Sequence, residues 1–185
     1  MRSIFVHQPD PLELRLRTSG WRQATVWLPV LLALAVIATE STGTFSGAHT
    51  SSWLRPIAER LFGTMSDSRW GEVHHLIRKT GHFCGYGLLV CLAFLRAWLL
   101  QLGRLTDLGR TAWRWRSCLL AVFSTAVIAS LDEWHQSFLP SRTGKASDVL
   151  LDTCGAVSTC ALVWFFVWRR RKGQTSRLPV PAPPR

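Results

Sequence analysis

The sequence predicts an all-α fold, an integral membrane four-helix bundle with a short extracytoplasmic amphipathic helix. Of the 185 residues, 48% are hydrophobic, and ten Trp and nine Phe accompany a single Tyr. Trp is favoured where an apolar ring meets the lipid–water boundary. The 22 Lys and Arg residues outnumber 11 Asp and Glu, and they lie in blocks between apolar runs rather than in stripes. This pattern excludes a nucleic-acid arm and indicates a membrane protein with no nucleic-acid partner.

The first apolar run covers residues 26–38, and Trp21 and Trp27 stand at its start. Counted as residues 21–39 it reaches about 19 residues, close to the length that spans a bilayer. A cleaved signal peptide has a similarly short apolar region. The preceding segment contains Asp10 and Glu13, which favours a retained helix behind a cytoplasmic tail.

Three further apolar runs follow, at residues 82–102, 117–131 and 149–168. The second contains Arg96, whose charge we expect to snorkel to the nearer surface. The fourth ends in aromatic residues directly before the basic block 169–172, the order of a membrane-interface anchor. The chain therefore divides into an N-terminal segment (1–25), a four-span domain (26–168) and a basic, Pro-rich tail (169–185).

The distribution of cations predicts the orientation of these spans. The N-terminal segment, the connection between the second and third spans and the C-terminal tail together hold 15 Lys and Arg when Arg96 is counted with the connection, against seven on the other side. Cytoplasmic segments carry the excess of Lys and Arg, so both termini of this multi-pass cell-membrane protein are predicted to be cytoplasmic. Residues 40–78 and 133–147 are then extracytoplasmic, and apolar residues recur at helical spacing over 53–62, as in an amphipathic interfacial helix.

The five cysteines all fall within apolar spans and none belongs to a CxxC pair. Free Cys in such surroundings behaves as a small hydrophobic residue. We therefore expect packing roles for these cysteines, and no disulfide framework or cofactor.

Polar side chains cluster at three span ends that the predicted topology places at the same, outer, membrane level. Ionisable residues at membrane depth are costly and mark functional sites. The convergence of three independent clusters therefore predicts one shared site, to which the loop after the third span adds Arg142 and Lys145. The clustered residues are Lys79, His82 and Tyr86, then Asp132, Glu133, His135 and Gln136, then Asp148 and Asp152.

Structural roles are the alternative at several of these positions. Ser147 could cap the fourth span with Asp148 in its first turn. Asp132 with Lys79, or Glu133 with Arg142, could be ion pairs that only hold helices together. His74 and His75 are expected in a solvated polar loop, and Arg78 as an interface anchor. Asp152 lies one turn deeper in an otherwise apolar helix, so it requires a partner.

Two motifs resemble those of VanZ-like membrane proteins. Residues 131–155 (LDEWHQSFLPSRTGKASDVLLDTCG) are similar to a DE-x-x-Q-x-F-x-P-x-R element followed by D-x-x-x-N-x-x-G, and residues 79–86 (KTGHFCGY) to K-x-x-H-x-x-x-Y. Asp152 departs from this pattern, which usually has Asn there. The resemblance implies a small multispan cell-envelope protein, in a family named after a member linked to teicoplanin resistance, and close helix packing at Gly155.

These residues support two hypotheses. The first is an enzyme that hydrolyses or transfers a phosphate ester of a lipid-linked envelope substrate. Its predicted catalytic residues are Glu133, Asp132 and His82, and its predicted substrate-binding residues are Lys79, Tyr86, Gln136, Arg142, Asp148 and Asp152. The second hypothesis is a non-catalytic binding or accessory protein in envelope assembly or antibiotic resistance. A metal site of His82, Asp132, Glu133 and His135 is the less favoured alternative to a metal-free site, because no tight ligand pair is present. The expected partners are membrane lipids and a lipid-linked envelope intermediate.

Overall fold

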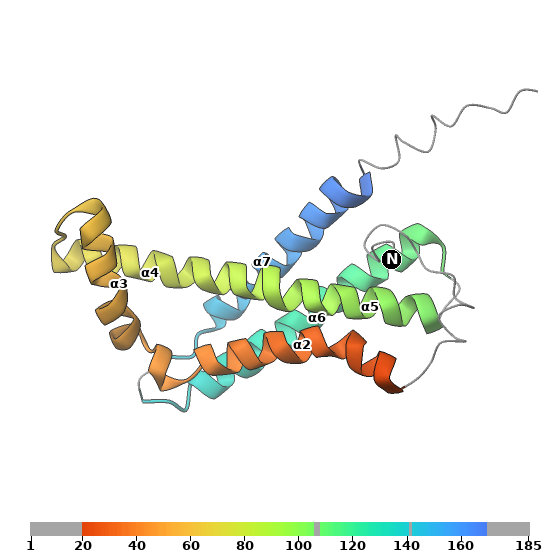
Figure 1. Cartoon of the computed structure of the whole chain (residues 1–185), viewed down its shortest axis with the longest axis horizontal. Helices are drawn as coiled ribbons and strands as arrows, with labels where there is room; N and C mark the ends of the chain where they lie inside the picture. Colours follow the sequence, from red (N-terminus) through yellow and green to blue (C-terminus); the bar gives the residue numbers. More distant parts are fainter. Residues whose placement is uncertain (1–19, 106–107, 141, 170–185) are drawn as a thin grey trace, which may run out of the picture.

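The computed structural model describes residues 20–105, 108–140 and 142–169, and every element in these ranges is helical (Figure 1). Most of the predicted N-terminal segment and nearly all of the predicted tail lie outside the described residues. In chain order the elements are α2 (Gly20–Glu40), η1 (Gly43–Phe45), α3 (Gly47–Phe62), α4 (Asp67–Cys84), the π-helical η2 (Gly85–Cys91), α5 (Leu92–Leu105), α6 (Arg110–Gln136), α7 (Ala146–Leu162) and the π-helical η3 (Val163–Arg169).

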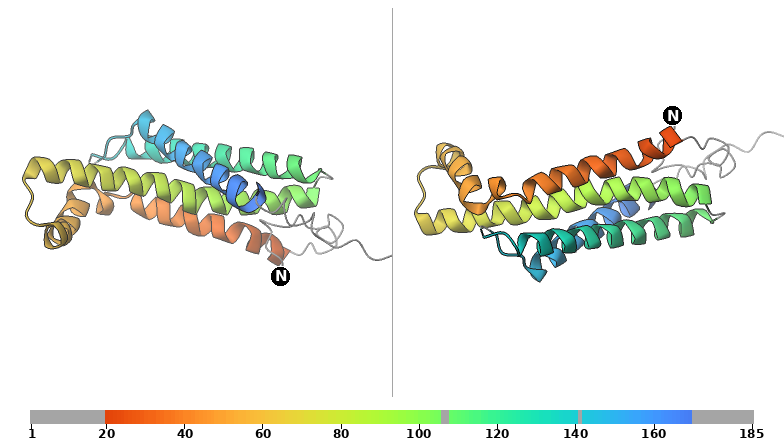
Figure 2. Two further views of the ribbon diagram at one scale, coloured as in Figure 1. Left: turned by 90° about the horizontal axis from the view of Figure 1, so that it is seen from above. Right: turned by 90° about the horizontal axis from the view of Figure 1, so that it is seen from below.

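Four helices in the described part of the chain are long and apolar enough to cross a membrane. They are α2, the continuous helix α4–η2–α5, α6, and α7 with η3, and they lie alongside one another in Figure 2. The predicted all-α membrane bundle is therefore confirmed. The helix α4–η2–α5 contacts each of the other three. The core residues along it, Tyr86, Val90, Leu95 and Leu99, are almost completely buried.

The helix that contains the second apolar run begins much earlier than residue 82. Its span candidate Asp67–Gly103 has 37 residues, about 55 Å of helix, whereas the hydrocarbon core is about 30 Å thick. Ser66 caps its start by accepting a hydrogen bond from the Arg69 amide, and Asp67 lies in its first turn. These start signals extend the helix beyond the apolar run, so its first turns project past the bilayer.

Because of this extension, the prediction that His74 and His75 lie in a polar loop was wrong, although His75 is exposed as expected. Both are on α4, and His74 is buried, with Nε2 3.0 Å from Thr50 Oγ1 of α3. Trp70 Nε1 donates to Ser51 Oγ across the same contact. The apolar periodicity over 53–62 is confirmed as part of α3, which folds against the projecting start of α4 (Figure 1).

Arg96 is bonded to the backbone of α2. Its Nη1 donates to the carbonyl oxygens of Thr25 and Val26 at 3.3 and 3.2 Å. Pro29 lies within α2 and has no N–H to offer the Thr25 carbonyl four residues earlier. Arg96 supplies that missing donor, so this charge within an apolar span joins two helices.

Two glycines allow the second and fourth spans to approach closely. A Cβ on Gly87 would lie 2.8 Å from the Gly155 carbonyl oxygen and 2.9 Å from Thr159 Oγ1. A Cβ on Gly155 would collide with the Phe83 carbonyl oxygen. The packing role expected for Gly155 is confirmed, and this contact brings residues 82 and 152 within reach of each other.

All five cysteines are free. Cys91, Cys118 and Cys160 are buried, and the Sγ atoms of Cys91 and Cys160 lie 3.7 Å apart. Cys84 and Cys154 are exposed on the helix surface. The packing role expected for all five cysteines therefore holds for the three buried ones, whereas Cys84 and Cys154 are not part of the core.

Candidate functional site

The three polar clusters come together at one end of the bundle, around the end of α6 and the start of α7. We call this region the polar end. It comprises Lys79, His82, Tyr86, Asp132, Glu133, Gln136, Arg142, Lys145, Asp148 and Asp152. The predicted convergence of the clusters is confirmed by three contacts between helices: Lys79 with Asp148, His82 with Asp152, and Tyr86 with Asp132.

Lys79 of α4 forms an ion pair with Asp148 in the first turn of α7. The anticipated alternative, a pair of Lys79 with Asp132, is not formed. Ser147 Oγ donates to Asp148 Oδ1 at 3.1 Å, but Ser147 is not the helix cap because α7 already begins at Ala146, with Lys145 at the N-cap. The Lys79–Asp148 pair therefore ties α4 to α7 beside the loop.

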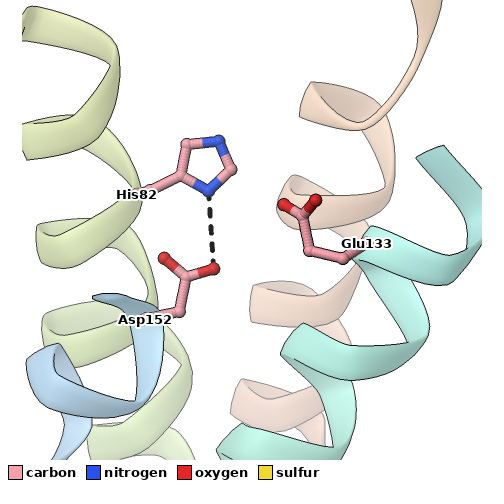
Figure 3. Close-up of side chains that lie close together, drawn as sticks. All are labelled: His82, Glu133 and Asp152. Carbon is pink, nitrogen blue, oxygen red and sulfur yellow. Dashed lines mark hydrogen bonds and ion pairs between the residues drawn. The ribbon is translucent and has the colours of Figure 1, made fainter. Parts of the chain in front are cut away.

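His82, Glu133 and Asp152 form a compact buried group, which we call the buried trio (Figure 3). His82 Nδ1 lies 3.5 Å from Asp152 Oδ2, and one ligand-type atom from each of the three residues lies within 4.8 Å of the others. Asp152 is 0% exposed and Glu133 is 5% exposed. His82 is thus the partner that the depth of Asp152 required.

Each carboxylate of the buried trio has one held oxygen and one unpartnered oxygen. Glu133 Oε2 accepts a hydrogen bond from the Lys145 backbone N–H at 2.8 Å, while Asp152 Oδ2 faces His82. The buried atoms Glu133 Oε1 and Asp152 Oδ1 have no hydrogen-bond partner among the described residues. Buried carboxylate oxygens normally have partners, so these two oxygens are available to a bound group.

Gly144 positions the loop that holds Glu133. A Cβ at this position would collide with the Glu133 carbonyl oxygen, and it would lie 3.1 Å from Ser137 Cβ. Glycine therefore lets the chain lie directly against the end of α6, which aims the Lys145 N–H at Glu133. Sequence reasoning missed this role because a glycine in a polar loop carries no signal of which backbone it will approach.

Asp132 is held by two donors. Tyr86 Oη and Gln136 Nε2 both donate to Asp132 Oδ2, each at 2.9 Å. His135 is exposed, and its Nδ1 lies 3.3 Å from Ser41 Oγ. Neither Asp132 nor His135 belongs to the buried trio, and Asp152 takes the place they had in the anticipated metal-ligand set.

Arg142 connects the α6–α7 loop to the end of α2. Its Nη2 donates to the carbonyl oxygens of Glu40, Thr42 and Phe45 at 2.6, 3.0 and 2.8 Å, whereas its buried Nε has no partner among the described residues. The anticipated pair with Glu133 is not formed. Burial, together with the nearby charge of Arg78, lowers the pKa of the Arg142 guanidinium below its ordinary value.

A cavity of about 300 Å³ adjoins the buried trio, of which His82 contributes to its lining, and this lining is strongly basic. Four Lys and Arg side chains line it against a single carboxylate, Asp148, which is already paired. The lining residues are His75, Arg78, Lys79, His82, Gln136, Pro140, Arg142, Thr143, Lys145 and Asp148. Arg78 and His75 were missed as site residues, because only the length of α4 places them over the cavity.

A second cavity, of about 230 Å³, adjoins the first and shares Arg78, His82 and Arg142 with it. Its remaining lining is mainly apolar and comes mostly from α2 and the α4–η2 helix, including Val36, Ile37, Gly85 and Leu89, with one residue each from η1 and α3. Val36 and Leu89 are also exposed on the surface of the bundle. The polar end therefore offers a basic compartment next to an apolar one that opens toward the lipid-facing side.

The family model for VanZ/LLP1 matches residues 3–168, and the chain belongs to this family. The match covers all four membrane-crossing helices and every residue of the polar end. The comparisons with curated proteins and with solved structures gave no match.

Proposed function

We propose that this VanZ/LLP1 family membrane protein binds the phosphate-bearing head group of a lipid-linked envelope substrate at its polar end and hydrolyses or transfers the phosphate ester. The observation that carries this proposal is the basic cavity, which holds four Lys and Arg side chains over a buried acid–base group. Lys and Arg side chains are well suited to bind a phosphate and to offset the charge that develops on it in the transition state.

The adjoining apolar cavity favours a lipid over a free phosphate compound. Because the two cavities share Arg78, His82 and Arg142, a head group in the first lies next to a chain in the second. The apolar lining from α2 and η2 suits the first carbons of an acyl or polyprenyl chain. A lipid already in the bilayer would enter from the side, without leaving the membrane.

The buried trio supplies acid–base groups for the reaction. In the proposed step, Glu133 accepts the proton of a water or acceptor hydroxyl as its oxygen bonds to phosphorus, and the bond from phosphorus to the leaving oxygen breaks. His82, oriented through Nδ1 by Asp152, returns a proton to the leaving oxygen. Asp132 positions the Tyr86 hydroxyl and the Gln136 amide beside the cavity in this scheme, since its Oδ2 is already held by both.

The experiment uses the full chain in nanodiscs with a long-chain polyprenyl diphosphate, and follows both lipid retention and phosphate release. We expect Lys145→Gln and Arg78→Gln to reduce lipid retention at least tenfold, and Glu133→Gln to retain the lipid but lose phosphate release. Arg69→Gln is the matched control, because Arg69 is exposed on α4 and outside the cavity lining. Equal retention by all variants would contradict the proposal, and full turnover in Glu133→Gln would remove Glu133 as the base.

A non-catalytic accessory role is the second candidate, and one observation favours it. Lys79, Arg142 and Glu133 are each bonded within the protein, to Asp148, to three α2–η1 carbonyls and to the Lys145 amide. Side chains held in this way can orient a ligand without reacting. Lipid retention by the parent protein with no phosphate release under any tested condition would favour this role over catalysis.

The proposal places the polar end on the outer face, with both termini in the cytoplasm, as the distribution of Lys and Arg predicts. A cysteine in the sequence between α6 and α7, Ser141→Cys, should be labelled from outside intact cells. A cysteine at the opposite end, Thr111→Cys, should be labelled only after permeabilisation, and the unmodified protein measures labelling of the native cysteines. Labelling of Ser141→Cys only from the cytoplasm would invert the orientation.

A further inference from the structure

The buried trio combines one imidazole and two carboxylates in a space that a single ion could share. Asp152 is on α7, Glu133 on α6 and His82 on α4, so three helices contribute one residue each (Figure 3). Two carboxylates in a buried position, with one neutral or singly charged histidine between them, leave negative charge uncompensated. Lys79 does not neutralise it, because its partner is Asp148.

The unpartnered oxygens are the independent sign of a ligand. Asp152, completely buried, has no hydrogen bond to Oδ1, and Glu133, 5% exposed, has none to Oε1, in the described part of the chain. Both carboxylates belong to the same cluster within 4.8 Å. Leaving two such atoms without partners is costly for a folded protein unless a bound group occupies them.

We propose that His82, Glu133 and Asp152 bind a divalent transition-metal ion of the Zn²⁺ or Mn²⁺ type at the base of the basic cavity. Imidazole favours Zn²⁺ over Mg²⁺ or Ca²⁺, and carboxylates accept all of these ions. Ligands about 2.1 Å from a tetrahedral ion lie about 3.4 Å from one another. His82 Nδ1 and Asp152 Oδ2 already have this separation, at 3.5 Å.

The remaining coordination requires only a side-chain adjustment of Glu133. The three ligand atoms lie within 4.8 Å of one another, so a movement on the order of 1 Å brings them to the separation of tetrahedral ligands. Glu133 Oε2 is anchored by the Lys145 N–H, the kind of second-shell contact that orients a ligating carboxylate. Three protein ligands leave a fourth position, and one of the three ligands, His82, also lines the cavity.

The metal site stands independently of the proposed lipid substrate, but it would change the roles of two residues if both proposals hold. With the ion bound, Glu133 and His82 are ligands, and a water in the fourth position becomes the nucleophile, because a metal lowers the pKa of its bound water. The four Lys and Arg residues of the cavity would then hold the phosphate against the ion.

The test is equilibrium binding of Zn²⁺ alone to the full chain, stripped with a chelator and held in detergent micelles without added lipid. We expect one ion per chain, with affinity reduced at least tenfold in Asp152→Asn, Glu133→Gln and His82→Asn. His135→Asn is the matched control, a histidine of the same region outside the trio, and its affinity should be unchanged. Circular dichroism of each variant checks that the helices remain.

Three outcomes would overturn the metal site: no stoichiometric binding by the parent, equal affinity in the trio variants, or loss of binding in His135→Asn alone. Metal binding without lipid retention would leave the metal site standing while contradicting the proposed function. Lipid turnover that persists unchanged after chelation, in a chain that binds no Zn²⁺, would retain the proposed function and remove the metal.

Discussion

The polar end and the rest of the bundle, which we call the bundle body, both bury polar atoms, but the hydrogen-bond partners of these atoms differ. In the bundle body, Trp113 Nε1 donates to the Leu99 carbonyl at 2.9 Å, and Ser117 Oγ and Thr125 Oγ1 donate to carbonyls one turn earlier at 2.8 Å. At the polar end, Glu133 Oε1, Asp152 Oδ1 and Arg142 Nε have no partner among the described residues.

This difference distinguishes polar groups that stabilise the bundle from polar groups that we assign to ligand binding. A hydroxyl that donates to a carbonyl of its own helix leaves no buried hydrogen-bond donor without a partner. An unpartnered buried carboxylate costs stability, and proteins accept such costs mainly at functional sites. The comparison can be tested by substitutions: removing packed groups should destabilise the protein, whereas removing a buried carboxylate charge at the polar end should stabilise it.

The largest effect is expected from Trp113→Ala. The Trp113 side chain is completely buried and its indole bridges α6 and α5. Its removal leaves a cavity and deprives the Leu99 carbonyl of the indole donor. We expect the free energy of unfolding to fall by about 3 kcal/mol. Unfolding in mixed micelles of increasing denaturing detergent measures this change. Trp21→Ala is the control, because Trp21 is 79% exposed, and a loss as small as in this control would contradict the prediction.

The next effect concerns the helix contact that assembles the polar end. Gly155→Ala places a methyl group against the Phe83 carbonyl, and the two backbones must separate. We expect a loss of about 2 kcal/mol in the free energy of unfolding. Gly71→Ala is the control, because it is the same change in a helix but a Cβ there would have open space around it. It should be neutral or stabilising. Equal stability of both variants would show that the close approach of α4 and α7 is dispensable.

The third prediction is an increase in stability, whereas the first two are decreases. Asp152→Asn keeps the shape of the side chain and removes one of the two carboxylate charges of the buried trio. In the presence of a chelator we expect the variant to be more stable than the parent by about 1 kcal/mol, because Asn can keep the contact with His82 while the buried charge on the carboxylate with the unpartnered Oδ1 is removed. Thermal unfolding followed by circular dichroism measures the change. Destabilisation by a similar amount would mean that Asp152 holds the helices together rather than serving a ligand.

The smallest effect is expected from Ser117→Ala. The Ser117 hydroxyl donates to the Trp113 carbonyl, which also accepts a hydrogen bond within the helix. Its loss leaves no buried atom newly unpaired, so the free energy of unfolding should change by about 0.5 kcal/mol. The same detergent titration used for Trp113→Ala provides the measurement. A change as large as that of Trp113→Ala would show that the bundle body also depends on polar contacts.

The sequence by itself determined the spans and the membrane level of the site. Apolar runs of sufficient length predict helices because a bilayer leaves no other way to satisfy the backbone. Consecutive spans cross in opposite directions, so clusters at the start of one span and the end of the next meet at one level. Lys79, Glu133 and Asp148 could be placed together on this basis, and the helical periodicity of 53–62 identified α3.

Only the tertiary structure decided which of these side chains face one another. Sequence spacing sets the height of a residue on its helix but leaves the rotation of that helix open, and the rotation depends on contacts between distant residues. Gly87 and Gly155 lock α4–η2 against α7, so Lys79 meets Asp148 instead of Asp132, and Asp152 meets His82. Arg142 likewise binds the end of α2 because the folded loop brings those carbonyls to it, and its distance from them along the chain conceals the contact.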